Sequence, residues 1–263
     1  MNLQLENKNV FISGSTQGIG FAIAQKLLSE GAHVIINGRH SQKVNSSVEK
    51  LTSEFPAARV SGIAADFSKV NEIENLLHQL PKIDVLVNNI GIFNIKPFAD
   101  ISDDEWEEIF QVNVMSGVRL SRKIMHDMLE RNWGRIIFIS SESAINVPAD
   151  MIHYGMTKTA MLAVSNGLSK LTKGTAVTVN TILGGPVYSE GVATAVEHIA
   201  TTNGLPVNDI KNQIMKTNKP DSLIDRFIET SEIANVVSFL ASPLSVAING
   251  AAIRVDGGAV NTI

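Results

Sequence analysis

Three polar side chains in the second half of the chain have the types and the spacing of an acid/base site. Tyr154 and Lys158 are four residues apart, and Ser141 precedes the tyrosine by thirteen residues. Residues four apart share one face of a helix, so we expect the phenol and the ammonium one turn apart. A neighbouring cation favours the phenolate and lowers the pKa of a tyrosine from its usual value of about 10. The spacing therefore predicts a tyrosine that can give and take a proton near neutral pH.

A glycine-rich turn near the start of the chain predicts a nucleotide site. The first expected strand, Asn9 to Ser13, leads directly into the run GSTQGIG at residues 14–20, and a helix is expected from about Ile19. Glycines allow a tight turn and a close approach of backbone to ligand. The free N–H groups and the positive end of the helix dipole then favour a pyrophosphate. The spacing Gly-x-x-x-Gly-x-Gly differs from the usual dinucleotide fingerprint, so the prediction depends on the flanking strand and helix.

The end of the second expected strand favours NADP(H) over NAD(H). An NAD site usually has an acidic residue there for the ribose 2′-hydroxyl, whereas this chain has Gly38 and then Arg39. The glycine offers no carboxylate to repel a 2′-phosphate, and the arginine can form a charge-assisted pair with it.

Apolar runs alternate with amphipathic runs along the chain, which predicts an α/β protein with a parallel sheet covered on both faces. Strands are expected at 10–12, 33–36, 60–64, 84–87, 135–140, 176–182 and 252–255, and helices at 18–30, 41–54, 69–79, 103–131, 150–173 and 231–241. No linker, repeat or low-complexity tract interrupts this order, so we expect one domain over residues 1–263. The segment 185–230 has only patchy helical signals and is expected to form a lid over the site, with a surface excursion as the alternative.

The composition excludes several classes of protein. Hydrophobic residues make up 44% and charged residues 18% of the chain, which are values of a globular protein. A net charge of −4 gives no electrostatic reason to expect nucleic acid or an anionic membrane as a partner. The chain has no cysteine and its six histidines are scattered, so no metal site is expected. Without a signal-peptide pattern or an apolar run of about 18–20 residues, we expect a cytoplasmic protein.

Taken together, the motifs resemble the classical short-chain dehydrogenase/reductase family over nearly the whole chain. In order, they are Gly14-x-x-x-Gly18-Ile19-Gly20, Asp66, Asn88-Asn89-Ile90-Gly91, Asn113, Ser141, Tyr154-x-x-x-Lys158 and Val255-Asp256-Gly257-Gly258. The resemblance implies a single Rossmann-type, doubly wound parallel sheet of seven strands in the order 3-2-1-4-5-6-7. It also implies a catalytic tetrad of Asn113, Ser141, Tyr154 and Lys158.

The same resemblance implies a set of residues that contact the cofactor. They are Gly14, Ser15, Thr16, Gly18, Ile19, Gly20, Arg39, Asp66, Phe67, Asn88, Gly91, Tyr154, Lys158, Gly185, Val187 and Ser189. Asp66 and Phe67 would lie by the adenine, Asn88 along the adenosine half, and Ser189 beside the carboxamide. Gln17 stands where NADP-binding members often have a second basic residue, so the preference for NADP(H) depends almost entirely on Arg39, and NAD(H) remains an alternative.

The family's chemistry agrees with the residue types. Hydride transfer to a ketone places negative charge on the carbonyl oxygen, which the site must stabilise and then protonate. Ser141 can orient the oxygen, and Tyr154 can supply the proton or accept it in the reverse oxidation. Lys158 can lower the pKa of the phenol and reach the nicotinamide ribose, and Asn113 would hold a water that relays protons to Lys158.

Two neighbouring residues compete for these assignments. Ser140 precedes Ser141, but only Ser141 has the family's spacing to the tyrosine. His153 adjoins Tyr154, but adjacent helical residues face different ways, so we assign it no chemistry.

We therefore expect an NADP(H)-dependent oxidoreductase acting on a small carbonyl or alcohol substrate. One alternative is a 3-oxoacyl-[acyl-carrier-protein] reductase, which would need a basic surface at the active-site mouth; the clustered candidates are Arg119, Arg122, Lys123 and Arg131. The other is a nucleotide-sensing protein without turnover, against which the presence of Ser141, Tyr154 and Lys158 argues. The substrate depends on residues 185–230, whose side chains cannot be placed from sequence.

Two long helices predict a homo-oligomer. Apolar residues beyond a single inward stripe occur in the helix 103–131 (Ile109, Phe110, Val112, Val114, Met115, Val118) and in the helix 150–173 (Met156, Ala160, Met161, Ala163, Val164, Leu168). A surface helix needs one apolar face for its own sheet, so a second face indicates a partner subunit. In resembling proteins these helices pair across a two-fold axis and the C-terminal strand region forms a second interface, which implies a homotetramer.

Overall fold

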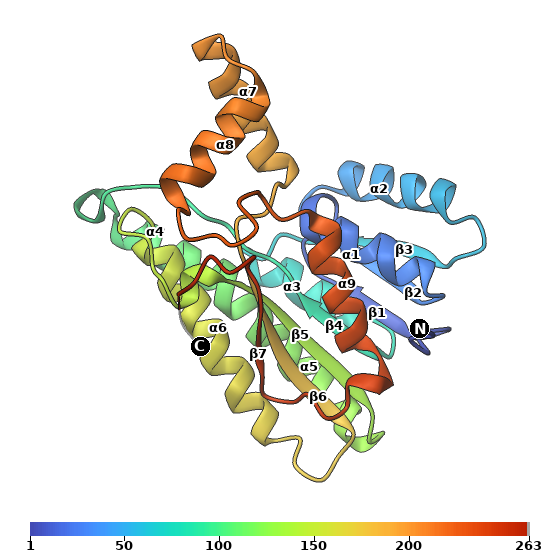
Figure 1. The fold of residues 1–263 in the computed structure, drawn as a ribbon. Helices are drawn as coiled ribbons and strands as arrows, with labels where there is room; N and C mark the ends of the chain where they lie inside the picture. The colour runs from blue at the N-terminus through green and yellow to red at the C-terminus, as the bar shows by residue number, and fades with distance from the viewer. Residues whose placement is uncertain (262–263) are drawn as a thin grey trace.

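The computed structural model describes residues 1–261, and its centre is one parallel sheet in the order β3-β2-β1-β4-β5-β6-β7 (Figure 1). The strands are β1 (Asn9–Ile12), β2 (His33–Gly38), β3 (Val60–Ala64), β4 (Val85–Asn88), β5 (Gly134–Ser141), β6 (Val177–Gly184) and β7 (Ala252–Val255). Every neighbouring pair is parallel. This confirms the Rossmann-type fold and the strand order, and each strand boundary lies within two residues of its expected place.

The neighbouring strands β5 and β6 are buried along almost their whole length, as apolar runs between two helical layers must be. Ile136 pairs with Val179 and Phe138 pairs with Thr181 across them. The last pair in this register joins Ser141 to Gly184, so both strands end together at the carboxyl edge of the sheet. That edge is where open α/β sheets bind ligands.

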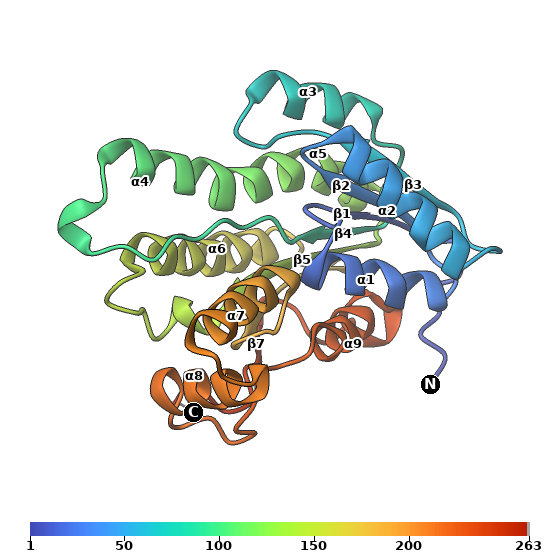
Figure 2. The same cartoon turned by 90° about the horizontal axis from the view of Figure 1, so that it is seen from above.

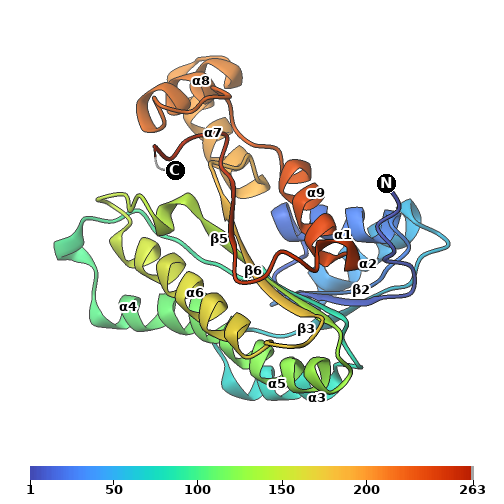
Figure 3. The same cartoon turned by 60° about the horizontal axis from the view of Figure 1, so that its bottom comes forward.

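Helices cover both faces of the sheet in two separate layers (Figure 3). On one face lie α1 (Gly18–Ser29), α2 (Ser41–Glu54) and α9 (Thr230–Ala241), and on the other lie α3 (Val70–Gln79), α5 (Ser116–Glu130) and α6 (Ile152–Lys170). The first layer packs residues such as Ile23, Leu27 and Val237 against the sheet, and the second packs residues such as Leu120 and Met128. Burial of these apolar side chains is the main force that holds the layers in place.

The expected continuous helix at 103–131 is in fact two α-helices joined by a π-turn. α4 (Asp103–Phe110) and α5 flank the π-helical η2 (Gln111–Met115), and the three run on from one another (Figure 2). Ser102 starts α4 with a capping box, accepting from the Glu105 N–H while the Glu105 carboxylate accepts from the Ser102 N–H. The apolar period does not reveal a π-turn, because one extra residue in a turn shifts the pattern only slightly. Such turns often occur at functional sites, and Asn113 lies in this one.

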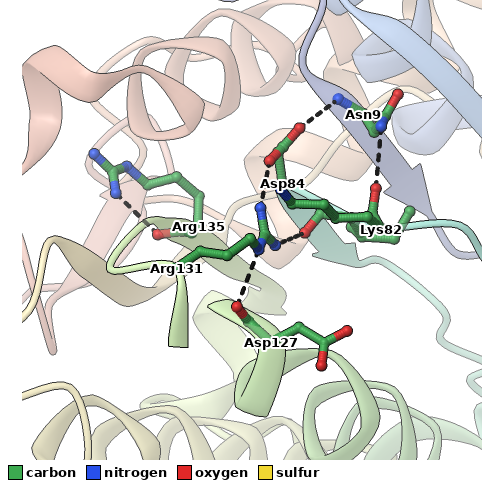
Figure 4. Close-up of polar contacts among 8 residues, drawn as sticks. Asn9, Lys82, Asp84, Asp127, Arg131 and Arg135 are labelled. Atoms are coloured by element: carbon green, nitrogen blue, oxygen red, sulfur yellow. Dashed lines mark hydrogen bonds and ion pairs between the residues drawn. The ribbon is translucent and has the colours of Figure 1, made fainter. Parts of the chain in front are cut away.

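An ion pair joins three elements at the amino edge of the sheet, opposite the ligand-binding edge (Figure 4). Asp84, directly before β4, accepts from the backbone N–H of Asn9 at 3.0 Å and from Arg131 Nη1 at 2.7 Å. Arg131, directly after α5, also donates to the carbonyls of Ile83 at 2.7 Å and of Asp127 at 3.0 Å. The pair fixes the start of β1, the start of β4 and the end of α5 relative to one another.

The segment expected to be a lid forms a helical hairpin that projects from the carboxyl edge of the sheet (Figure 1). Its helices are α7 (Glu190–Asn203) and α8 (Val207–Asn218), which are more regular than the expected patchy signals. They are stable as a pair because Val196, Ala200 and Ile210 form a small apolar cluster of their own. An isolated parallel bridge between Val187 and Ile228 holds the two ends of the hairpin together.

Among residues 1–261, none of the helices has the length and apolar character needed to cross a membrane.

Candidate active site

Ser141, Tyr154 and Lys158 come together where β5 ends against α6. The Ser140 hydroxyl donates to the carbonyl of Lys158 at 2.9 Å, and Lys158 Nζ donates to the carbonyl of Ile139 at 3.0 Å. These two hydrogen bonds attach the middle of α6 to the last residues of β5. Ser140 is thereby occupied with the backbone, whereas Ser141 is hydrogen-bonded to Tyr154. The geometry supports the choice of Ser141 over Ser140.

Tyr154 is partly buried, and this changes its proton affinity. Burial raises the pKa of Tyr154, the hydrogen bond with Ser141 lowers it, and the negative charge of Glu142 raises it again, so that the net shift is upward. The lowering by Lys158 expected from the sequence does not occur in this structure, because desolvation of the phenolate dominates. A raised pKa favours the protonated phenol.

Lys158 is a buried cation with only 4% of its surface exposed. Burial lowers the pKa of Lys158 to about 8, because a desolvated ammonium is disfavoured. Its Nζ lies 5.5 Å from the centre of the Tyr154 ring. A Cβ at Gly91 would lie only 3.1 Å from this nitrogen, so a larger residue at position 91 would crowd the ammonium.

Asn113 ties the π-turn to the loop after β4 and to α6. Its Oδ1 accepts from the N–H of Ile92 at 2.7 Å, and its Nδ2 donates to the Ile92 carbonyl at 2.9 Å and to Thr157 Oγ1 at 3.0 Å. Asn113 is therefore engaged with protein groups on both sides of its amide. The same Cβ placed on Gly91 would lie 3.9 Å from Asn113 Oδ1, so Asn113 and Lys158 flank one point of the site.

The glycine-rich turn is built without room for side chains. Gly14 and Gly18 have φ values of +61° and +60°, a region that favours glycine, and a Cβ at Gly20 would lie 2.5 Å from the Gly14 carbonyl oxygen. Asn37 Oδ1 accepts from the Gly14 N–H at 3.1 Å, and Asn89 Nδ2 donates to the Gly14 carbonyl at 2.8 Å. These two asparagines, whose positioning role the sequence pattern did not reveal, fix the turn at the start of α1.

This turn fits the diphosphate of a dinucleotide. α1 begins at Gly18, so its unpaired N–H groups and its positive dipole end lie at the turn. Asn88, at the end of β4, is buried and its Oδ1 has no hydrogen-bond partner among the described residues. A ribose hydroxyl could donate to this oxygen, so Asn88 fits the place along the cofactor that the resemblance implies.

The residues beyond β2 form a basic rim. A Cβ at Gly38 would lie 2.6 Å from Thr16 Cγ2, so an acidic residue does not fit there without rearrangement. Arg39 is exposed and its charge acts on Asp66, beyond β3. Burial alone would raise the pKa of Asp66, but hydrogen bonds from Ser68 and the charges of Arg39 and Lys69 hold it below its usual value.

Two further residues refine the expected cofactor contacts. Lys43, on α2, donates a hydrogen bond to Gln17 and so brings a second cation to the rim, which the sequence analysis missed. Phe67 has 2% of its surface exposed and packs into the core under the second helical layer. Only its backbone is therefore available to an adenine.

The remaining predicted contacts lie at the base of the helical hairpin. Gly185 directly follows β6, and a Cβ there would lie 2.7 Å from Asp256 Cα. Val187 forms the bridge to Ile228. A Cβ on Gly18 would lie 3.6 Å from Ser189 Cβ, so Ser189 adjoins the glycine-rich turn. The structure thus places the lid base and the turn side by side.

The sequence analysis also missed three residues around the acid/base cluster. Phe93 lies edge-on to Tyr154, with ring centres 6.0 Å apart. Glu142 follows Ser141 directly and forms a buried ion pair with Lys219, from the end of α8. The position of Glu142 next to Ser141 was a usable signal, but nothing in the sequence indicates Lys219 as its partner.

The chain belongs to the short-chain dehydrogenase family, because a model described as short chain dehydrogenase matches residues 8–200. The uncharacterized oxidoreductase YvaG of Bacillus subtilis (strain 168) is 46% identical over 263 residues, which covers both chains completely. The 3-oxoacyl-[acyl-carrier-protein] reductase FabG of Aquifex aeolicus is 30% identical, covering 98% of this chain and 99% of its own.

The solved structures give the same result for the fold. L-sorbose reductase from Gluconobacter frateurii, complexed with NADPH and L-sorbose, superimposes with a TM-score of 0.94 at 26% identity. The match covers 100% of both chains, so it includes the lid hairpin as well as the sheet. The chain is an oxidoreductase of this family.

Proposed function

We propose that the protein is an NADP(H)-dependent reductase or dehydrogenase that interconverts a small carbonyl compound and its alcohol. The observation that carries the proposal is the cluster of Ser141, Tyr154 and Lys158 beside the open glycine turn. The bound nicotinamide would supply the hydride for reduction or accept it in oxidation. The hairpin of residues 185–230 serves as a lid over this site.

The chain's own residues would perform the proton chemistry. Ser141 donates a hydrogen bond to the carbonyl oxygen and keeps it next to Tyr154. The tyrosine, protonated at neutral pH, gives its proton to that oxygen as negative charge develops on it. Lys158 binds the ribose hydroxyls and compensates the charge left on the phenolate. Asn113 keeps the loop after β4 against α6. It thereby maintains the space in which a relay water would sit.

The basic rim supports a preference for NADP(H). Arg39 and Lys43 can both reach a 2′-phosphate at the end of β2, where Gly38 leaves no carboxylate to repel it. The structural neighbour L-sorbose reductase was solved with NADPH.

The Arg39→Ala variant should lose most of this preference. A charge-assisted contact is worth roughly 1.5–3 kcal/mol, so NADPH affinity should fall about ten- to a hundredfold while NADH affinity stays unchanged. Adding Lys43→Ala should remove the remaining preference for NADPH. Lys50→Ala should not change the preference, because Lys50 lies on the same helix α2 but packs against Phe21. Fluorescence titration of both reduced cofactors measures this. Equal affinities of the wild type for NADPH and NADH would contradict the assignment.

The carrier-protein alternative receives less support from the structure. It requires a basic surface at the site's mouth, but Arg131 is paired with Asp84 at the opposite edge of the sheet. Arg122 lines a groove between α5 and α6, away from the carboxyl edge. A FabG relative at 30% identity leaves this activity as an alternative, but two of the four candidates for its docking surface, Arg122 and Arg131, lie away from the mouth of the site.

We further propose that the protein is a homotetramer whose first interface is the pair α5 and α6. These helices border an apolar groove of about 540 Å³ lined by residues that include Met125, Leu129, Val164, Leu168 and Leu171. Leu171 has 63% of its surface exposed. A groove of this character indicates a surface that a partner covers.

Light scattering should give a mass of about four times the 28.4 kDa of one chain. Leu168→Glu would place a charge in the groove and should reduce the mass to that of a smaller species. Val70→Glu, at an exposed apolar residue on α3, serves as the matched control and should leave the mass unchanged. A monomeric wild type, or a Leu168→Glu protein with the full mass, would contradict this interface.

A further inference from the structure

Glu142 is a buried carboxylate in the middle of the candidate site. It begins the 3₁₀-helix η3 (Glu142–Ala144) directly after β5, next to Ser141 in sequence. Only 4% of its surface is exposed. Acidic side chains are rarely buried to this extent unless they are paired. The burial of this carboxylate therefore requires partners that stabilise its charge.

One of the two carboxylate oxygens, Oε1, has a partner. Glu142 Oε1 pairs with the ammonium of Lys219, which caps the end of α8 in the lid. Lys219 is itself mostly buried, with 18% of its side chain exposed. The pair therefore joins the lid to the segment that directly follows Ser141.

The other carboxylate oxygen, Oε2, has no such partner among the described residues. Glu142 Oε2 is buried and has no hydrogen-bond partner among residues 1–261. A buried acceptor left without a donor destabilises a protein, and native structures almost always provide one. The nearby Asp256 cannot help, since it is an acceptor too and its oxygens already accept from the N–H groups of Gly258 and Val260 at 3.2 Å. Since none of residues 1–261 supplies a donor, a bound molecule is the partner that we consider.

The residue that carries the free oxygen lies close to the reacting tyrosine. The charge of Glu142 acts on Tyr154, so the carboxylate is near the phenol that exchanges the proton. Phe93, the other residue found against Tyr154, is apolar and offers no hydrogen bond. Near the phenol, Glu142 is thus a polar group that can distinguish a hydroxyl from a hydrogen.

The charge balance selects the kind of donor. Lys219 neutralises Glu142, so the pair as a whole carries no net charge. A cationic substrate would find no net attraction there, and an anionic one would be repelled by the oxygen that Lys219 does not contact. A neutral hydroxyl can donate to that oxygen without disturbing the ion pair.

We propose that Glu142 Oε2 accepts a hydrogen bond from a substrate hydroxyl close to the reacting carbonyl, so that the preferred substrates are uncharged hydroxyketones and the corresponding diols. The proposal rests on the carbonyl–alcohol chemistry proposed above and adds the substrate class. Because Lys219 comes from the lid, the acceptor is complete only when the lid lies against the site.

A matched pair of ketones tests the proposal. We compare kcat/KM with NADPH for 1-hydroxy-2-butanone and 2-butanone, which differ by one hydroxyl. The wild type should prefer the hydroxyketone at least tenfold. Glu142→Leu should lower that preference by about ten- to a hundredfold, since a site built to bind a hydroxyl discriminates strongly against analogues that lack it. The ratio cancels any general effect of the variant on Tyr154, which both ketones share.

Further variants separate the role of the oxygen from a merely structural one. Glu142→Gln keeps the shape and one acceptor, so it should retain part of the preference and fold even if Glu142→Leu does not. Lys219→Met should reduce the preference, whereas Lys216→Met, at an exposed lysine on the same helix, should not. A wild type without preference, or equal losses for both ketones in the Glu142 variants, would overturn the assignment to Glu142. Failure of the wild type to reduce any ketone or oxidise any alcohol would instead refute the proposed function.

Discussion

Replacing Tyr154 by phenylalanine should lower kcat by about a hundred- to ten-thousandfold and leave the fold and NADPH affinity intact. The substitution removes only the hydroxyl, and general acid catalysis by a positioned side chain contributes a factor of this size. Because the pKa of Tyr154 is raised by burial, the wild-type reduction rate should be flat through neutral pH. The reverse oxidation, which needs the phenolate, should accelerate as the pH rises. Initial rates in both directions over pH 6–10 measure both effects.

The chain provides a matched control for this experiment. Its other tyrosine, Tyr188, lies at the lid base with its ring 5.5 Å from that of Phe227. Tyr188→Phe should keep most of the turnover. A Tyr154→Phe protein with near-wild-type rates would disprove the mechanism. A wild type that binds NADPH but turns over nothing would favour the nucleotide-sensing alternative.

Replacing Lys158 by methionine should stabilise the fold while it damages function. The pKa of Lys158 is about 8 in the folded protein and about 10.5 in an unfolded chain. Between these pH values the unfolded chain holds a proton that the folded chain lacks, so the stability of the wild type rises with pH across this window. Below it, burial of the ammonium costs the wild type up to about 3 kcal/mol, of which the lost hydrogen bond to Ile139 offsets roughly 1 kcal/mol in the variant.

Urea denaturation at several pH values measures this effect. Lys158→Met should be about 2 kcal/mol more stable than the wild type at pH 7, and the advantage should vanish as the pH approaches 10.5. Its turnover and its NADPH affinity should both fall, because the ammonium serves the phenol and the ribose. Lys170→Met, at an exposed lysine on the same helix, should change neither stability nor activity. A variant less stable than the wild type at pH 7 would show that the buried charge carries no such cost.

The sheet could be predicted from the sequence because each strand is a short apolar run next to an amphipathic one. Residues such as Val85 and Ile136 are buried for the same local reason that made them recognisable. The π-turn at 111–115 and the two lid helices were harder to predict. The first alters the apolar period too little, and the second depends on a small cluster around Val196 that forms only when both helices are present.

The candidate site was predictable to the extent that its residues follow fixed local spacings. Ser141, Tyr154 and Lys158 meet because β5 and α6 are adjacent in the chain and are held together by hydrogen bonds. Contacts across distant segments left no such signal, as the pair Glu142–Lys219 illustrates. The direction of the pKa shift of Tyr154 was also beyond sequence reasoning, because it depends on how much water the fold excludes.

The bridge between Val187 and Ile228 brings the start and the end of the lid to adjacent points of the sheet edge. The residues between them form an insert that is attached at this bridge, at the ion pair of Lys219 with Glu142 and at the hydrogen bond from the Leu223 N–H to the Gly257 carbonyl. The register of β5 with β6 is set by residues outside this insert. We therefore expect substitutions within α7 and α8 to change which substrates the protein accepts while the sheet beneath keeps its register.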